Sequence, residues 1–245
     1  MHKTRKGAMT NPETGVADGL PWLAADTLTM SVFHNALRRD LERSEILLGS
    51  PENLSPRRSR RLGRHLQWMM HTLRWHHEGE DHHLWPLLLE REPGSSAVLD
   101  AMQAEHHAID GPVLALEAHA RGLVAGRTEP RDVMDAVKTL AKPLIEHLAH
   151  EEDEAMEIVS RVLSHRDWND FEQRAWIDGY TVWESVRFVA WMVDGVEWNR
   201  PIRRRAGLPA PIYWAVVKPL ALIAHVPGLS IWAGTPAARV RSRVA

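Results

Sequence analysis

The sequence predicts an all-α fold: an up-down-up-down four-helix bundle followed by an additional helical C-terminal extension. Apolar residues recur at helical spacing in four long segments, and short stretches rich in proline, glycine and serine separate these segments. No alternating β-pattern occurs in this span, and four helices joined by short loops favour antiparallel neighbours. We therefore divide the chain into an N-terminal tail (1–28), a bundle (29–163) and a Trp-rich basic helical extension (164–245).

The first two helices have recognisable ends in the sequence. The first is predicted for residues 29–48 and stops at the Gly-Ser-Pro sequence that follows it. Ser55 and Pro56 supply an N-cap and a first-turn proline for a long second helix, which reaches about residue 90.

The other two bundle helices follow the same rules. The Pro-Gly-Ser-Ser break at residues 93–96 precedes a third helix that is predicted to end near residue 125. Thr128 and Pro130 then begin a fourth helix, which continues to about residue 163.

One short chemical pattern occurs twice in the chain. His-His-Glu-Gly-Glu-Asp covers residues 76–81, and His-Leu-Ala-His-Glu-Glu covers residues 147–152. Each copy places a histidine four residues before a carboxylate, with a second carboxylate next to it. On a helix, residues four apart are separated by about 40° around the axis and about 6 Å along it, so each pair can reach one ion. The doubled pattern therefore suggests two ions.

A comparison of the two copies decides which residues correspond. In the first copy, a four-apart pair can begin at either of the two histidines. In the second copy, the position of His77 is occupied by Leu148, which cannot bind a metal. The matched pairs are therefore His76 with Glu80 and His147 with Glu151.

Matching histidines also occur on the other two predicted helices. His34 and His106 are 72 residues apart, and His76 and His147 are 71 residues apart. This agreement indicates a duplicated helix pair related by an approximate two-fold axis. The four-apart pairs continue apolar, core-facing stripes, where a buried polar group needs a partner. A metal ion supplies that partner.

The types of residue narrow the choice of metal. The chain has no cysteine, which excludes disulfides, thiolate metal sites and a cysteine nucleophile. Imidazole and carboxylate without thiolate suit iron, manganese, zinc or similar ions. The di-iron and di-manganese carboxylate bundles use a Glu-x-x-His motif, whereas this chain has His-x-x-x-Glu.

This set of residues resembles the hemerythrin-like (HHE cation-binding) family over residues 28 to 163, including the Leu-Trp-Pro sequence at 84–86. The extension is more weakly similar to one found in actinobacterial members. The resemblance implies a non-haem di-iron centre in which Glu80 and Glu151 bridge the two iron ions and the histidines are terminal ligands. The residues that carry it are His34, His76, Glu80, His106, His147 and Glu151.

Two further candidate ligands have roles that the sequence leaves open. Oxygen-carrying members of the family have a second histidine four residues after the third-helix histidine, and here that position is Asp110. As a ligand, Asp110 would make the centre more anionic, favour the ferric state and argue against reversible oxygen carriage. Alternatively, it is a turn residue before Gly111. His77 is either an additional ligand or a residue that contacts a ligand without binding the metal itself.

Charge is distributed unevenly along the chain. From Trp198 onward there is no acidic residue and the net charge is +8, so the first 197 residues carry −10. We expect the extension to pack its tryptophans across the bundle, basic against acidic, where it could cap or gate the metal pocket. The alternative is peripheral contact with an anionic membrane.

The sequence also bears on location and partners. The N-terminal tail lacks the apolar segment of a signal peptide, and three prolines with Lys218 and His225 argue against a membrane span in residues 211–234. We expect a cytoplasmic protein, with or without peripheral membrane contact, that does not bind nucleic acid.

The predicted function is binding or reduction of a small oxidant, namely O2, hydrogen peroxide or nitric oxide, at a His/carboxylate di-iron centre. Whether the protein is an enzyme stays open; an enzyme of this kind would be an oxidoreductase. One alternative is a di-iron oxidase or oxygenase that acts on an organic substrate, with the extension forming its pocket. The other is a non-catalytic iron or oxygen sensor whose extension moves when the site changes state.

Overall fold

The computed structural model describes residues 22–177, 179–197, 213–223 and 230–243, together with residues 202, 211 and 226. Helices dominate these residues, and the only β-type pairing among them is an isolated bridge between Ala24 and Ser164. The all-α prediction is confirmed. None of the described helices has the length and apolarity needed to cross a bilayer.

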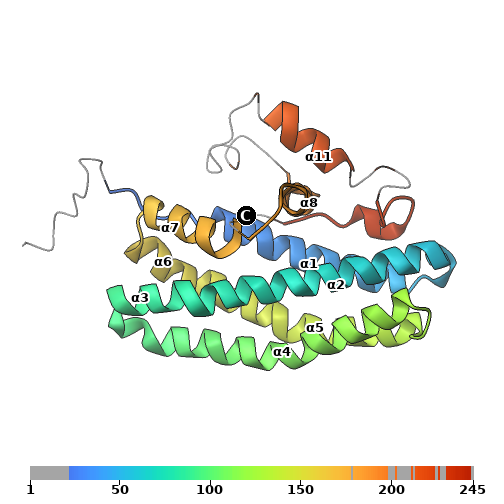
Figure 1. The fold of residues 1–245 in the computed structure, drawn as a ribbon, viewed down its shortest axis with the longest axis horizontal. Helices are drawn as coiled ribbons and strands as arrows, with labels where there is room; N and C mark the ends of the chain where they lie inside the picture. Colours follow the sequence, from blue (N-terminus) through green and yellow to red (C-terminus); the bar gives the residue numbers. More distant parts are fainter. Residues whose placement is uncertain are drawn as a thin grey trace, which may run out of the picture.

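Four long helices with roughly aligned axes form the bundle (Figure 1). α2 packs against α4, α4 against α5, and α5 against α1. A π-helical turn and a short α-helix extend both α2 and α5, so the second and fourth bundle helices each consist of three pieces. The pieces are α1 (Leu28–Leu48), α2 (Pro56–Gly79), η2 (Glu80–Leu84), α3 (Trp85–Arg91), α4 (Ser96–Val124), α5 (Pro130–His150), η4 (Glu151–Ala155) and α6 (Met156–Val162).

Local sequence explains where these helices begin and end. The Ser55 side chain accepts a hydrogen bond from the backbone N–H of Arg58 at 3.3 Å, and Pro56 occupies the first turn of α2. Gly126, just after α4, has φ of +68°, a left-handed conformation that costs glycine little. Short 3-10 turns at Pro51–Asn53 and Pro93–Ser95 join the first three helices.

The two π-helical turns lie at equivalent places in the duplicated pattern. The backbone N–H of Trp85 bonds the carbonyl of Glu80, and that of Met156 bonds the carbonyl of Glu151, both across five residues instead of four. Each π-turn therefore begins at the carboxylate of a four-apart pair. Single π-turns inside α-helices are frequent at functional sites.

The extension lies against α1 and α2, on the side of the bundle away from α4 and α5 (Figure 1). Side chains of Ser164 and Thr181 form capping boxes with Asp167 and Glu184 at the starts of α7 and α8. We call residues 230–243 the C-terminal strap. The helices of the extension are α7 (His165–Glu172), η5 (Gln173–Ile177), α8 (Val182–Val193), η6 (Tyr213–Val217), α11 (Lys218–Ile223) and, within the strap, η7 (Pro236–Arg239).

A buried ionic cluster joins the extension to α1. Arg43 forms an ion pair with Asp194, which follows α8, and donates a hydrogen bond to the Val240 carbonyl in the strap at 2.8 Å. Arg39 donates to the carbonyl of Trp191 at 3.0 Å. Trp191 in turn donates its indole N–H to Asp40 on α1 at 2.9 Å. These bonds satisfy charges that would otherwise be buried without partners.

The polarity of this contact is the reverse of the expected one. The sequence predicted a basic extension against an acidic bundle, but here the arginines belong to the bundle and Asp194 to the extension. A second contact has the same polarity, because Arg91 on α3 pairs with Asp167 on α7 at 2.8 Å. The arginines at positions 200 and 203–205 lie outside the described residues.

Candidate metal centre

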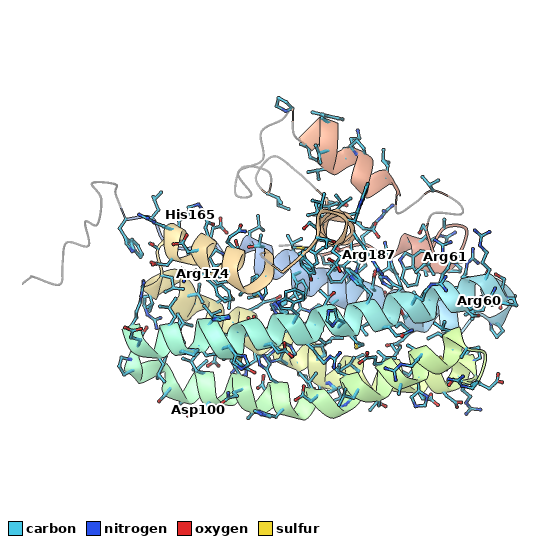
Figure 2. All side chains as sticks on the ribbon, in the orientation of Figure 1. Arg60, Arg61, Asp100, His165, Arg174 and Arg187 are labelled. Atoms are coloured by element: carbon cyan, nitrogen blue, oxygen red, sulfur yellow. The ribbon has the colours of Figure 1, made fainter. Side chains whose placement is uncertain are left out.

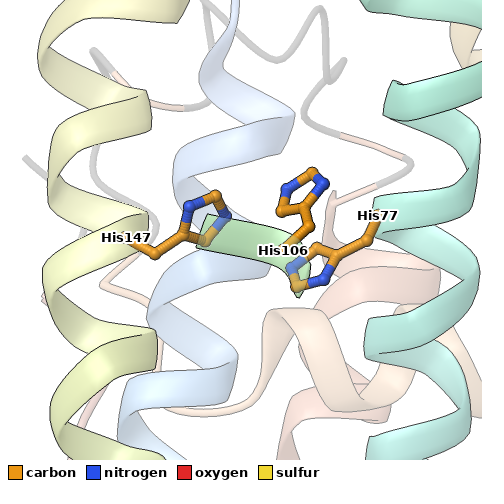
Figure 3. A group of neighbouring side chains, drawn as sticks. All are labelled: His77, His106 and His147. Atoms are coloured by element: carbon orange, nitrogen blue, oxygen red, sulfur yellow. The ribbon is translucent and has the colours of Figure 1, made fainter. Parts of the chain in front are cut away.

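Seven histidine and glutamate side chains meet in the interior of the bundle. All are buried, with no more than 5% of their surface exposed. Figure 3 shows three of these histidines pointing toward one another from α2, α4 and α5. The seven residues are His34 on α1, His76 and His77 on α2, Glu80 in η2, His106 on α4, His147 on α5 and Glu151 in η4.

These side chains form two groups, each with the spacing of a metal site. In each group, one possible ligand atom per residue lies within 4.8 Å of the others. Tetrahedral and octahedral sites of first-row metals require donors about this close together. One group contains His77, His106 and His147, and the other contains His34, His76 and Glu151.

The carboxylate of Glu80 lies between the two groups. Its Oε1 is 3.0 Å from Nε2 of His76, and its Oε2 is 3.6 Å from Nε2 of His106. One oxygen is therefore directed to each group, which is the arrangement of a bridging carboxylate.

Glu151 occupies the corresponding position in the second copy. Its Oε2 is 3.3 Å from Nε2 of His34 and 3.8 Å from Nε2 of His147. The two glutamates thus connect the same two groups of histidines.

Three further carboxylates lie at the edge of the cluster and form hydrogen bonds with its histidines. Asp81 accepts a hydrogen bond from Nδ1 of His106, and Glu152 accepts one from Nδ1 of His34, both at 2.9 Å. Glu105 bonds Nδ1 of His147 at 2.9 Å. With the proton on Nδ1, the lone pair of Nε2 faces the interior of the cluster, as a metal-binding histidine requires.

The duplicated pattern contained a signal for two of these three supports. Asp81 directly follows Glu80, and Glu152 directly follows Glu151. Asp81, on the second bundle helix, holds the histidine of the third, and Glu152, on the fourth, holds the histidine of the first. The adjacent carboxylates are visible in the repeat, but their role is not. Glu105 had no comparable signal, because it lies outside both copies of the pattern, next to His106 on the third bundle helix.

The cluster also contains polar atoms that form no hydrogen bond with any residue the structure describes. They are Nε2 of His77, His106 and His147 and both carboxylate oxygens of Glu80 and Glu151. An unsatisfied buried polar group costs about 1–3 kcal/mol. A positive ion between the groups would give these atoms a partner, so the donor set fits a bound metal.

Electrostatics within the cluster favour the same conclusion. Burial, together with the nearby Glu151 carboxylate, raises the pKa of Glu80 well above its ordinary value. Burial also lowers the pKa values of His76 and His77 well below normal. Burial opposes ionisation of Glu151 as well, but His34 and His76 lower its pKa below the usual range. The neutral imidazoles of His76 and His77 are ready to bind a metal, and a cation would allow both glutamates to ionise together.

The structure places the two remaining candidate ligands, His77 and Asp110, in different environments. His77 belongs to a three-histidine group, and its ring stacks on that of His106 with centroids 3.9 Å apart. Asp110 is exposed and belongs to neither group. It lies beside the buried stripe of α4, which runs through His106, Ile109 and Val113. The expected contribution of Asp110 to a more anionic centre has no counterpart in this geometry, where the additional side chain beside the cluster is the imidazole of His77.

Aromatic residues cover the His34/His76 side of the cluster. The ring of Phe33 lies 4.3 Å and that of Trp176, from η5, lies 5.0 Å from the His76 ring, measured between centroids. Trp191 of α8 packs against Phe33 at 5.6 Å. Gly79 allows Trp176 to approach, because a Cβ there would lie 2.7 Å from the indole nitrogen. The extension thus forms part of the wall of the site.

The fold and the site together define a four-helix bundle with a buried His/carboxylate centre suited to cations. The model of the hemerythrin HHE cation-binding domain matches residues 27–159, and the chain belongs to this family. No curated protein and no solved structure matches the sequence significantly.

Proposed function

We propose that this protein is a non-haem di-iron protein that binds or reduces a small oxidant: O2, hydrogen peroxide or nitric oxide. The observation that carries the proposal is the pair of adjacent ligand groups linked by Glu80 and Glu151. The group of two histidines and one carboxylate is a donor set typical of non-haem iron. Iron held by these residues would supply Lewis acidity and electrons to the oxidant.

Unequal numbers of protein donors suggest where the oxidant binds. The group with His77 has three imidazoles near the two glutamates, whereas the group with His34 and His76 has only two. The second group therefore leaves more room for an external ligand. Phe33 and Trp176 cover this side closely, which favours a diatomic molecule or a peroxide over a large organic substrate.

The first test is a count of bound metal. The protein is loaded with ferrous iron under anaerobic conditions, and we expect about two irons per chain, as in other di-iron bundles. A variant with His76→Ala and His147→Ala loses one imidazole from each group and should lose the iron. The matched control carries His82→Ala and His107→Ala, which remove exposed histidines whose hydrogen bonds among the described residues are to backbone carbonyls one turn away. Iron retained by the first variant, or absent from the wild type, contradicts the proposal.

The second test identifies the reaction. The ferrous protein is mixed with O2, peroxide or nitric oxide while absorbance is followed. A spectrum that reverses when the gas is removed indicates binding, and repeated consumption of oxidant in the presence of a reductant indicates catalysis. Failure of all three to change the spectrum of the loaded protein would overturn the assignment to small oxidants.

A second candidate function is sensing, which the contact between His76 and Trp176 favours. A change at His76 would be transmitted to η5 and from there to the rest of the extension. Limited proteolysis of the apo, ferrous and oxidised protein tests this possibility. Different cleavage in the extension without multiple turnover supports a sensor, and identical cleavage in all three states contradicts one.

A further inference from the structure

The extension presents apolar side chains on its outer surface. In α8, Val182 and Trp183 are 77% and 81% exposed, and Val186 and Val189 continue the exposed strip at helical spacing. The end of the same helix instead buries Trp191 and Val193. α8 therefore has one apolar region packed on the bundle and another that faces outward.

The next described helices enlarge this exposed area. α11 packs against α8, and Trp214 in η6 and Leu222 in α11 are each more than half exposed. We call the exposed side chains of these helices the outer face, formed by Val182, Trp183, Val186, Val189, Trp214 and Leu222. Exposed apolar side chains gathered in this way mark interaction surfaces more often than isolated ones do.

A strongly basic segment lies at the start of α2. Five arginines occur within residues 57–64, and no described residue forms an ion pair with Arg57, Arg60 or Arg64, all of which are exposed. Like charges this close on a helix repel one another, so the cluster destabilises α2 unless a negatively charged partner binds it. Within the fold, Arg58 donates to the Ala233 carbonyl of the strap at 3.1 Å, which ties this end of α2 to the extension.

The basic segment and the outer face belong to the same half of the molecule. Figure 1 shows α8 and α11 above α1 and α2. Figure 2 shows Arg60 and Arg61 near the start of α2, and Arg187 by α8. Lys218 of α11 lies 4.0 Å from the ring centre of Trp214, which adds a cation at the outer face itself. In the sequence, residues 198–210 contribute four more arginines and no acidic residue.

We propose that the outer face and the arginine cluster of α2 together bind the surface of an anionic lipid bilayer. Tryptophan favours the membrane interface, valine and leucine favour the acyl region below it, and arginine favours the negative headgroups. Glu184, the acidic residue on α8, is occupied in the capping box with Thr181. This binding does not depend on the metal centre and can be tested separately from it.

Other partners fit the surface less well. Nucleic acid would use the arginines and stack on the tryptophans, but it has no use for exposed valine and leucine side chains. A second copy of the chain would bring two basic regions together, which is unfavourable. An anionic bilayer uses both the charge and the apolar side chains.

The test measures sedimentation of the full chain with lipid vesicles. We expect binding to vesicles that contain phosphatidylglycerol, little binding to pure phosphatidylcholine, and weaker binding as salt increases. Changing Arg57, Arg60 and Arg64 to glutamine should lower the affinity on the order of 100-fold, and changing Trp183 and Trp214 to alanine should lower it roughly tenfold or more. All five side chains are exposed, so the fold should tolerate both changes.

The matched control removes exposed apolar side chains elsewhere. Leu114 on α4 and Ile145 on α5 are also exposed, and their helices lie on the opposite side of the bundle. The Leu114→Ala and Ile145→Ala variant should bind vesicles like the wild type. The proposal is overturned by absence of binding to anionic vesicles, or by full binding of the Trp183/Trp214 variant. A dimer in light scattering that this variant dissociates would overturn it too, because the outer face would then bind a second copy.

Discussion

At the scale of single residues, three carboxylates outside the cluster set the orientation of its histidines. Asp81, Glu105 and Glu152 each hold the outer nitrogen of a histidine and so direct Nε2 inward. A carboxylate in this position also makes the imidazole a stronger donor. In both copies of the pattern, the carboxylate inside the cluster is therefore followed directly by one that supports a histidine.

This arrangement leads to a prediction for Asp81. Asp81→Asn keeps the shape of the side chain but weakens its hold on His106, so metal affinity should fall about 10–100-fold. Competition with a chelator measures the change. The control is Asp153→Asn, an exposed carboxylate in η4 whose loss should leave the affinity unchanged. Equal affinities for the two variants would contradict a supporting role.

At the scale of elements, close helix packing depends on single glycines. Gly63 faces α4, and a Cβ at this position would lie 2.6 Å from the Ala120 carbonyl oxygen and 2.7 Å from a methyl group of Val124. A backbone oxygen cannot move away without shifting its helix, so α2 and α4 could not keep their present separation.

Gly63→Ala should therefore destabilise the protein even though alanine favours helices. We expect the free energy of unfolding to fall by about 1–3 kcal/mol, as for other overpacked sites. Urea denaturation checks this value. Gly94→Ala adds the same methyl group where no atom lies within 4 Å, and it should change stability by less than about 0.5 kcal/mol. A stabilised Gly63 variant would show that the helices separate at little cost.

At the scale of the whole molecule, the ionic cluster around Asp40 holds the extension on the bundle. Burial opposes ionisation of Asp40, but Arg39, His65 and Arg43 lower its pKa well below the usual range. A carboxyl group with a lowered pKa in the folded state stabilises the fold above its ordinary pKa of about 4, and that contribution disappears as pH falls.

The pH dependence of stability should therefore change when Asp40 is altered. For the wild type, this contribution should decline below about pH 5. Asp40→Asn leaves two buried arginines with less compensation and should lower stability at neutral pH by about 3–5 kcal/mol. The variant should also lose less stability on acidification. Unfolding curves from pH 3 to 7 test both points, with the exposed Asp100→Asn as control. Parallel pH profiles for the wild type and Asp40→Asn would contradict the assignment.

Helical spacing and duplication alone were enough to predict six of the seven residues in the cluster. The roles of His77 and Asp110 remained open, because both depend on the rotation of a helix against its neighbours. His76 and His77 are about 100° apart on α2, yet the bundle surrounds this face widely enough to bury both. Asp110 is about 40° from His106 and already lies outside the buried stripe.

The sequence alone therefore determined the helical class, the duplication and the His-x-x-x-Glu pairs, since these follow from periodicity within one segment. Only the tertiary structure decided the support by Asp81, Glu105 and Glu152, the position of His77 beside His106, and the polarity of the ion pair between Arg43 and Asp194. Each of these depends on which residues, distant in the chain, meet when amphipathic faces pack. Local spacing shows which side chains share a helix face, but only packing shows what that face contacts.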